Sequence, residues 1–139
     1  MSNATTTRIA TFGMLIILSL FVLFHLLILT GIVPFEAVWG GRLKDRSQML
    51  SFESVSIIIN LVMLAIVSIN AGALKVSISN KVIKAALWVM FALFILNTAG
   101  NALSNNKLEK LLFTPVTMAL ALGSLVLARS KAHKAATVA

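Results

Sequence analysis

The chain has 139 residues, of which 59% are hydrophobic and 12% are charged, with a mean hydropathy of +0.99 and no cysteine. In ordinary soluble domains about 25% of residues are charged, so this composition excludes a typical soluble protein and indicates an integral membrane protein. The lack of cysteine excludes disulfides, thiolate metal sites and CxxC redox chemistry.

The formal net charge of +8 could suggest a nucleic-acid partner. However, the twelve Lys and Arg residues lie between the apolar segments or at the termini instead of along one face. Lipid headgroups are therefore the expected counter-charge, and the bilayer rather than a nucleic acid is the expected partner.

Four long apolar segments predict four membrane-spanning helices, at about residues 9–33, 52–74, 84–103 and 111–128. A helix rises about 1.5 Å per residue, so roughly 20 apolar residues cross a hydrocarbon core about 30 Å thick. Short polar connectors force neighbouring helices to run antiparallel. The predicted fold is all-α: a polytopic membrane protein with one transmembrane domain over residues 1–139, built as an antiparallel four-transmembrane-helix bundle.

The first apolar segment superficially resembles a signal peptide because it follows Arg8. It is much longer than a signal-peptide apolar region, and Glu36 and Trp39 stand where a small-residue cleavage site would be expected. We therefore expect it to remain in the protein as the first transmembrane helix.

Local signals predict where the helices begin and how they pack. Ser51 is the expected N-cap of the second helix, with Glu53 in its first turn near the positive end of the helix dipole. Pro115 is expected in the first turns of the fourth helix. Ala119 and Gly123 form a small-xxx-small pattern that favours close helix contact.

The distribution of basic residues favours an orientation with both termini in the cytoplasm. With that orientation, the cytoplasmic side holds seven basic residues: Arg8, Lys75, Lys81, Lys84, Arg129, Lys131 and Lys134. The opposite side holds five: Arg42, Lys44, Arg46, Lys107 and Lys110.

Polar residues inside the predicted spans concentrate in the half of the bundle next to the first and third connectors. Helical spacing places Glu53, Ser56 and Asn60 on one face of the second helix. Asn97 and Asn101 share a face of the third helix. Both faces should turn inward, because an unsatisfied amide in hydrocarbon costs several kcal/mol.

A polar cavity beneath the first connector is the predicted ligand-binding site. Its predicted lining consists of seven residues: His25, Trp39, Arg42, Glu53, Asn60, Asn97 and Asn101. No cofactor, metal site or catalytic residue is predicted, because a metal would require more than the single histidine found within the spans.

Each of these residues also has a purely structural interpretation. Asn97 and Asn101 could serve only as hydrogen-bonding contacts between helices, and His25 could be a satisfied histidine within the bundle. Glu53 could be a helix-dipole partner or an ion-pair partner of Arg42. A tryptophan such as Trp39 is commonly an interfacial anchor.

Three strings resemble those of small uncharacterised four-helix bacterial inner-membrane proteins: residues 34–43 (PFEAVWGGRL), 97–101 (NTAGN) and 113–117 (FTPVT). The resemblance would extend over most of the chain. It implies the same fold and a location in the inner membrane, but no reaction and no functional residue.

Three functions remain open on the sequence alone. The first is binding, with or without transport, of a small polar or amphipathic molecule in a cavity on the side of the first and third connectors. The second is an accessory or assembly subunit that docks another membrane protein through its polar and small-residue faces, with self-association or a larger complex left open. The third, ranked last, is an interfacial lipid-modifying enzyme in which His25 and Glu53 act as acid and base.

Overall fold

A computed structural model describes residues 3–130, which form helices of three kinds and contain no strand. Its four α-helices are α1 (Asn3–Leu29), α2 (Arg46–Asn70), α3 (Asn80–Ala102) and α4 (Thr114–Arg129). Its short helices are the 3₁₀ turns η1 (Phe35–Ala37) and η2 (Trp39–Gly41) and the π-helical turn η3 (Glu109–Phe113). Lys131 and Lys134, which enter the charge comparison above, lie outside the described residues.

Four helical segments are long and apolar enough to cross a membrane: Ala4–Leu29, Arg46–Asn70, Asn80–Ala102 and Glu109–Arg129. Large apolar side chains cover much of their outer surface, including Ile16, Ile58 and Leu96, which are 60%, 60% and 70% exposed. In water such a surface would be strongly unfavourable, whereas lipid chains match it. The predicted all-α, four-helix membrane architecture is therefore confirmed.

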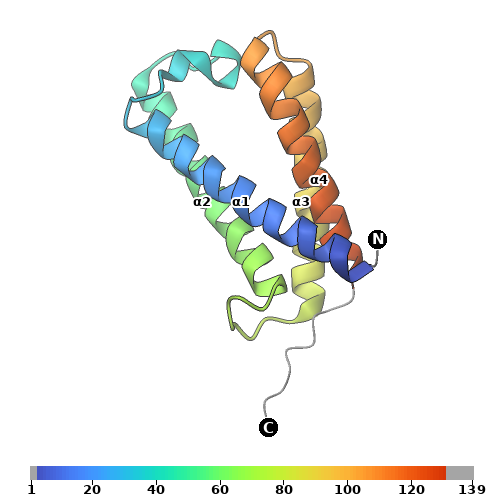
Figure 1. Cartoon of the computed structure of the whole chain (residues 1–139). Helices are drawn as coiled ribbons and strands as arrows, with labels where there is room; N and C mark the ends of the chain where they lie inside the picture. The colour runs from blue at the N-terminus through green and yellow to red at the C-terminus, as the bar shows by residue number, and fades with distance from the viewer. Residues whose placement is uncertain (1–2, 131–139) are drawn as a thin grey trace.

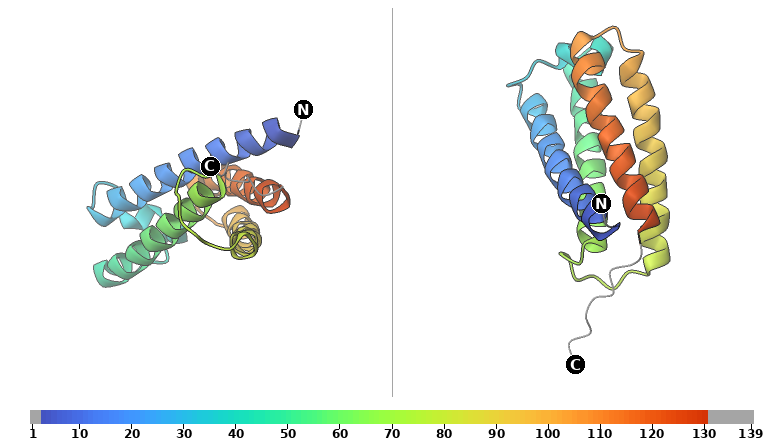
Figure 2. Two further views of the ribbon diagram at one scale, coloured as in Figure 1. Left: turned by 90° about the horizontal axis from the view of Figure 1, so that it is seen from below. Right: turned by 45° about the vertical axis from the view of Figure 1, so that its right-hand side comes forward.

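The helices are arranged as two antiparallel pairs, α1 with α2 and α3 with α4 (Figure 1). The pairs come together near the second connector, where α1 also packs against α4, and separate toward the first and third connectors (Figures 1 and 2). Contact between α2 and α3 is much less extensive than contact within either pair. The bundle thus has one closely packed end and one splayed end.

Gly123 allows α1 and α4 to approach closely. A Cβ atom at this position would lie 2.7 Å from Cγ and 2.9 Å from Sδ of Met14, so a side chain could not be added without displacing the Met14 side chain. The predicted close contact at Gly123 is confirmed, and the helix it contacts belongs to this chain. A docking surface for another protein cannot use Gly123, which is buried, whereas Ala119 is exposed.

Several helix ends differ from the predicted ones by four to six residues, and the signals at two of them can be identified. Helix α1 ends at Leu29 because Gly31, with φ of +82°, reverses the chain, and the N–H of Val33 donates to the carbonyl of Leu27 at 3.1 Å. Helix α2 begins at Arg46, since the Asp45 side chain accepts a 2.8 Å hydrogen bond from the N–H of Gln48. The prediction that Ser51 caps this helix is therefore wrong.

The fourth membrane segment enters through the π-helical turn η3. Pro115 has no N–H and its ring would collide with a carbonyl one turn earlier in a regular α-helix. The wider turn avoids this problem, and the N–H of Thr114 donates to the carbonyl of Glu109 five residues back. Pro115 stands at the beginning of α4, as predicted, and the turn before it carries Glu109 and Phe113 into the splayed end.

Candidate functional site

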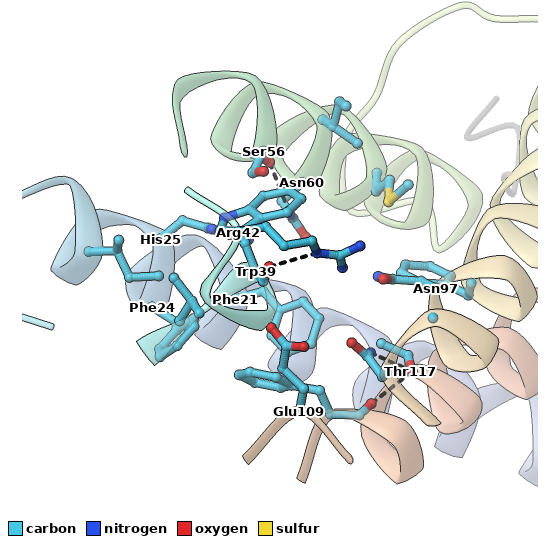
Figure 3. Close-up of a pocket in the computed structure, with 18 residues that line it drawn as sticks. Phe21, Phe24, His25, Trp39, Arg42, Ser56, Asn60, Asn97, Glu109 and Thr117 are labelled. Atoms are coloured by element: carbon cyan, nitrogen blue, oxygen red, sulfur yellow. Dashed lines mark hydrogen bonds between the residues drawn. The ribbon is translucent and has the colours of Figure 1, made fainter. Parts of the chain in front are cut away.

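A cavity of about 290 Å³ lies between the two helix pairs at the splayed end. Its apolar wall is largely aromatic and includes Phe21, Phe24, Trp39, Phe94 and Phe113. Its polar wall is formed by His25, Arg42, Ser56, Asn60, Asn97, Asn101, Glu109 and Thr117 (Figure 3). A mixed lining of this kind is typical of pockets that bind small molecules.

The first connector forms the roof of the cavity, to which Val38, Trp39 and Arg42 contribute. Three consecutive residues of this roof have positive φ angles: 55° at Trp39, 64° at Gly40 and 69° at Gly41. For a bulky residue such as Trp39 this conformation is strained, at a cost of about 1–3 kcal/mol, and it persists only where other contacts hold it.

Glu53 provides the first of those contacts, from α2. Its carboxylate is fully buried and accepts hydrogen bonds from Nε1 of Trp39 at 2.7 Å and from Nδ1 of His25 at 2.6 Å. A carboxylate only accepts, so Nδ1 of His25 carries a proton in this arrangement. Glu53 therefore ties α1, α2 and the roof together, and the predicted alternative of an ion pair with Arg42 is wrong.

Glu109 provides the matching contact from η3, and the sequence analysis missed it. This buried carboxylate accepts a 2.6 Å hydrogen bond from the N–H of Gly40 and another from the hydroxyl of Ser104. Asn106 adds a third connection, since its Nδ2 donates to the carbonyl of Ala37 at 2.7 Å. The roof is thus attached to both helix pairs.

One signal could have identified Glu109. The chain has only four acidic residues, and an acid at the edge of an apolar segment is costly unless it has partners. In the sequence this signal is obscured, because the basic residues Lys107 and Lys110 flank Glu109 and give the segment the composition of a polar connector.

Gly40 is required at the meeting point of the roof and Glu109. A Cβ atom there would lie 3.3 Å from Nε of Arg42 and 3.7 Å from Oε2 of Glu109. The guanidinium of Arg42 and the carboxylate of Glu109 therefore both face Gly40, a residue that also has a positive φ angle.

Arg42 extends from the roof into the cavity (Figure 3). Its Nε donates to the carbonyl of Trp39 at 3.0 Å, which fixes the direction of the side chain. Its terminal amino groups have no hydrogen-bond partner among residues 3–130. They are consequently able to bind a molecule that occupies the cavity.

The three predicted asparagines differ in how far their side-chain hydrogen bonds are satisfied within the protein. Nδ2 of Asn101 donates to the Thr117 hydroxyl at 3.4 Å, and that hydroxyl also accepts from Thr98 at 2.9 Å, so Asn101 contributes to α3–α4 packing. Asn60 is buried, and its Nδ2 donates to the carbonyl of Ser56 at 2.9 Å. Asn97 is exposed and has no partner within the described chain.

Six of the seven predicted residues line this one cavity, and the seventh, Glu53, lies directly behind His25 and Trp39. The structure brings them together from α1, α2, α3 and the first connector. That they bind a ligand remains a prediction. Within the described part of the chain, no group of three or more His, Asp or Glu side chains is placed to hold a metal ion.

We compared the chain with protein-family models, with curated proteins and with solved structures, and none of them matches it. The resemblance to small bacterial inner-membrane proteins therefore stays a prediction, and the function has to be argued from the cavity itself.

Proposed function

We propose that this protein is a multi-pass membrane protein that binds a small amphipathic molecule in the cavity at its splayed end. One observation carries the proposal. Hydrogen-bonding groups without partners in the described chain, on Arg42 and Asn97, border a space whose other walls are largely aromatic. In hydrocarbon such groups are costly unless a ligand or water satisfies them.

The two sides of the cavity call for two kinds of ligand chemistry. The aromatic side chains Phe21, Phe24 and Phe113 contact one another edge to face, with Phe113 centred 6.1 Å from Phe21 and 5.4 Å from Phe24. Such a rigid apolar wall suits a hydrocarbon or ring system. The facing guanidinium and amide groups suit a polar head, so the matching ligand is amphipathic.

We extend the proposal from binding to transport of the bound molecule. The roof is held by hydrogen bonds to both helix pairs, and it contains strained backbone at Trp39. Strained segments of this kind are often points of conformational change. Release of the roof would connect the cavity to the aqueous side of the first and third connectors.

We further propose an inner-membrane location, on the resemblance to small bacterial inner-membrane proteins, and a cytoplasmic position for both termini, on the excess of basic residues on that side. Fusion of a reporter that is active in only one compartment to the C-terminus tests the orientation. Activity of a periplasmic reporter would contradict it.

Native mass spectrometry of the purified protein in detergent tests the proposed binding. We expect a small molecule to remain bound to the wild-type chain and to be lost in Asn97→Leu, which removes a polar wall without adding bulk to the core. Asn105→Leu is the matched control, because Asn105 is exposed and does not line the cavity. Equal ligand occupancy in the two variants would contradict the proposal.

An enzyme acting on an interfacial lipid is the second candidate, and the His25–Glu53 pair favours it. A carboxylate that holds Nδ1 of a histidine leaves Nε2 available as a general base, and His25 lines the cavity. The test is turnover of added lipid substrates by the wild type and by His25→Gln. Turnover that survives in the variant would exclude this role for His25.

A further inference from the structure

We infer that the ligand is a single-chain amphiphile with an anionic head, and that it reaches the cavity sideways from the bilayer, between α2 and α3. The inference rests on the proposed binding function and adds to it the class of ligand and the route of access. Three features of the splayed end support it: the anchored roof, the loose contact between α2 and α3, and the unpaired donors of Arg42.

The roof covers the cavity on the side of the first connector. Glu53 binds Trp39 from α2, and Glu109 binds Gly40 from η3, so the first connector is attached on both sides of the cavity. The ring of Trp39 also packs against Phe52, with ring centres 5.1 Å apart. A molecule arriving from the aqueous phase would have to pass this anchored connector, whereas a molecule in the bilayer would not.

The side between α2 and α3 is open. These two helices have little contact with each other compared with their contacts to α1 and α4. Ile59 of α2 lines the cavity and is 45% exposed, and Asn97 of α3 lines it and is also exposed. Gly100, one turn further along α3, also lines the cavity, and a Cβ atom there would meet nothing within 4 Å.

The unsatisfied hydrogen-bond donors of the cavity that suit an anion are on Arg42. Both oxygens of the Glu53 carboxylate accept hydrogen bonds, and so do both oxygens of Glu109. The terminal amino groups of Arg42 have no such partner in residues 3–130. A planar guanidinium binds carboxylates and phosphates through paired hydrogen bonds, so the head of the ligand should be one of these two groups.

The size of the cavity and the surface beside it favour one hydrocarbon chain. A volume of about 290 Å³ is at the low end of the roughly 300–1,000 Å³ found for ligand pockets. It accommodates a head and the first part of one chain. The rest of the chain would lie in the membrane along Val62 and Leu93, exposed apolar residues on the faces that also carry Ile59 and Asn97.

Photo-crosslinking with a diazirine-bearing palmitate tests this inference on the full chain in nanodiscs. We expect saturable labelling of α2 and α3 near Ile59 and Asn97, with at least a tenfold loss in Arg42→Gln and partial retention in Arg42→Lys. Lys44→Gln is the matched control, since it removes an exposed cation from the same connector without lining the cavity. A diazirine-bearing short-chain acid and an excess of inorganic phosphate, as competitor, test for a water-soluble ligand.

Labelling spread over all lipid-facing surfaces, or labelling equal in Arg42→Gln and Lys44→Gln, would overturn the inference. So would labelling of the same positions by the short-chain acid, or loss of palmitate labelling in excess phosphate. The proposed binding function fails separately, if native mass spectrometry finds no difference between Asn97→Leu and Asn105→Leu. Circular dichroism and gel filtration of Arg42→Gln and Arg42→Lys establish that the variants are folded.

Discussion

The two ends of this bundle use polar residues in opposite ways. At the closely packed end, Nζ of Lys84 donates to Oδ1 of Asn70 at 3.3 Å, to the carbonyl of Leu127 at 2.6 Å and to the hydroxyl of Ser130 at 3.1 Å. A single cation thereby joins the end of α2, the beginning of α3 and the end of α4. At the splayed end, polar groups on Arg42 and Asn97 remain without partners in the described chain and face a cavity.

This difference distinguishes polar residues that stabilise the fold from those available for binding. Buried glutamates hold the roof of the cavity in place and have their hydrogen bonds satisfied by the protein. Arg42 and Asn97 in the cavity wall, by contrast, have hydrogen-bonding groups without partners in the described chain. Substitutions at the packed end should therefore reduce stability, whereas substitutions of Arg42 and Asn97 should reduce binding and leave stability nearly unchanged.

Gly123→Leu should have the largest effect on stability. The new side chain would collide with Met14, and overpacking of this kind costs about 3 kcal/mol. Thermal unfolding in detergent, followed by circular dichroism, should show a strongly lowered midpoint. Gly13→Leu is the control, because a Cβ atom there meets nothing within 4 Å. Equal midpoints for the two variants would show that the α1–α4 contact does not hold the packed end together.

Glu109→Leu should loosen the roof. It leaves the N–H of Gly40 and the hydroxyl of Ser104 without their acceptor, at a total cost of about 2 kcal/mol. In a Trp88→Phe background, acrylamide should quench the fluorescence of Trp39 more strongly than in the parent. Glu36→Leu, an exposed position in the same connector, should change quenching little. Unchanged quenching in Glu109→Leu would contradict the role of Glu109 in closing the roof.

Lys84→Met should weaken the packed end by about 1–2 kcal/mol, because it removes charge-assisted hydrogen bonds from a partly buried position. Lys81→Met is the matched substitution at an exposed position on the same helix. We expect a lower unfolding midpoint in Lys84→Met alone. Similar midpoints in both variants would remove the contrast between the two ends.

The architecture could be predicted from the sequence because membrane-spanning helices depend mainly on length and apolar composition. The antiparallel arrangement of neighbouring helices then predicts that His25, Asn60 and Asn97 lie at the same end of the bundle, and the cavity is found there. The helix ends were less predictable, since Asp45 and Ser51 are both competent caps and only the hydrogen bond from Gln48 distinguishes them.

The long-range partners could not be predicted. Glu53 binds His25 across 28 positions and Glu109 binds Gly40 across 69 positions, and no local pattern encodes either distance. Both bonds depend on the path of the first connector, which is set by positive φ angles at Trp39 and Gly40. Helical periodicity carries no information about such a turn, so the roof and the role of Glu109 required the structure.

The most direct test of the account fills the cavity without disturbing the packing around it. Gly100→Leu places a side chain in open space within the cavity, and Gly13→Leu places the same side chain in open space on α1, away from it. We predict unchanged unfolding midpoints in both variants, together with loss of the bound amphiphile in native mass spectra of Gly100→Leu only. Full retention of the ligand in Gly100→Leu would contradict the claim that the splayed end is a binding site.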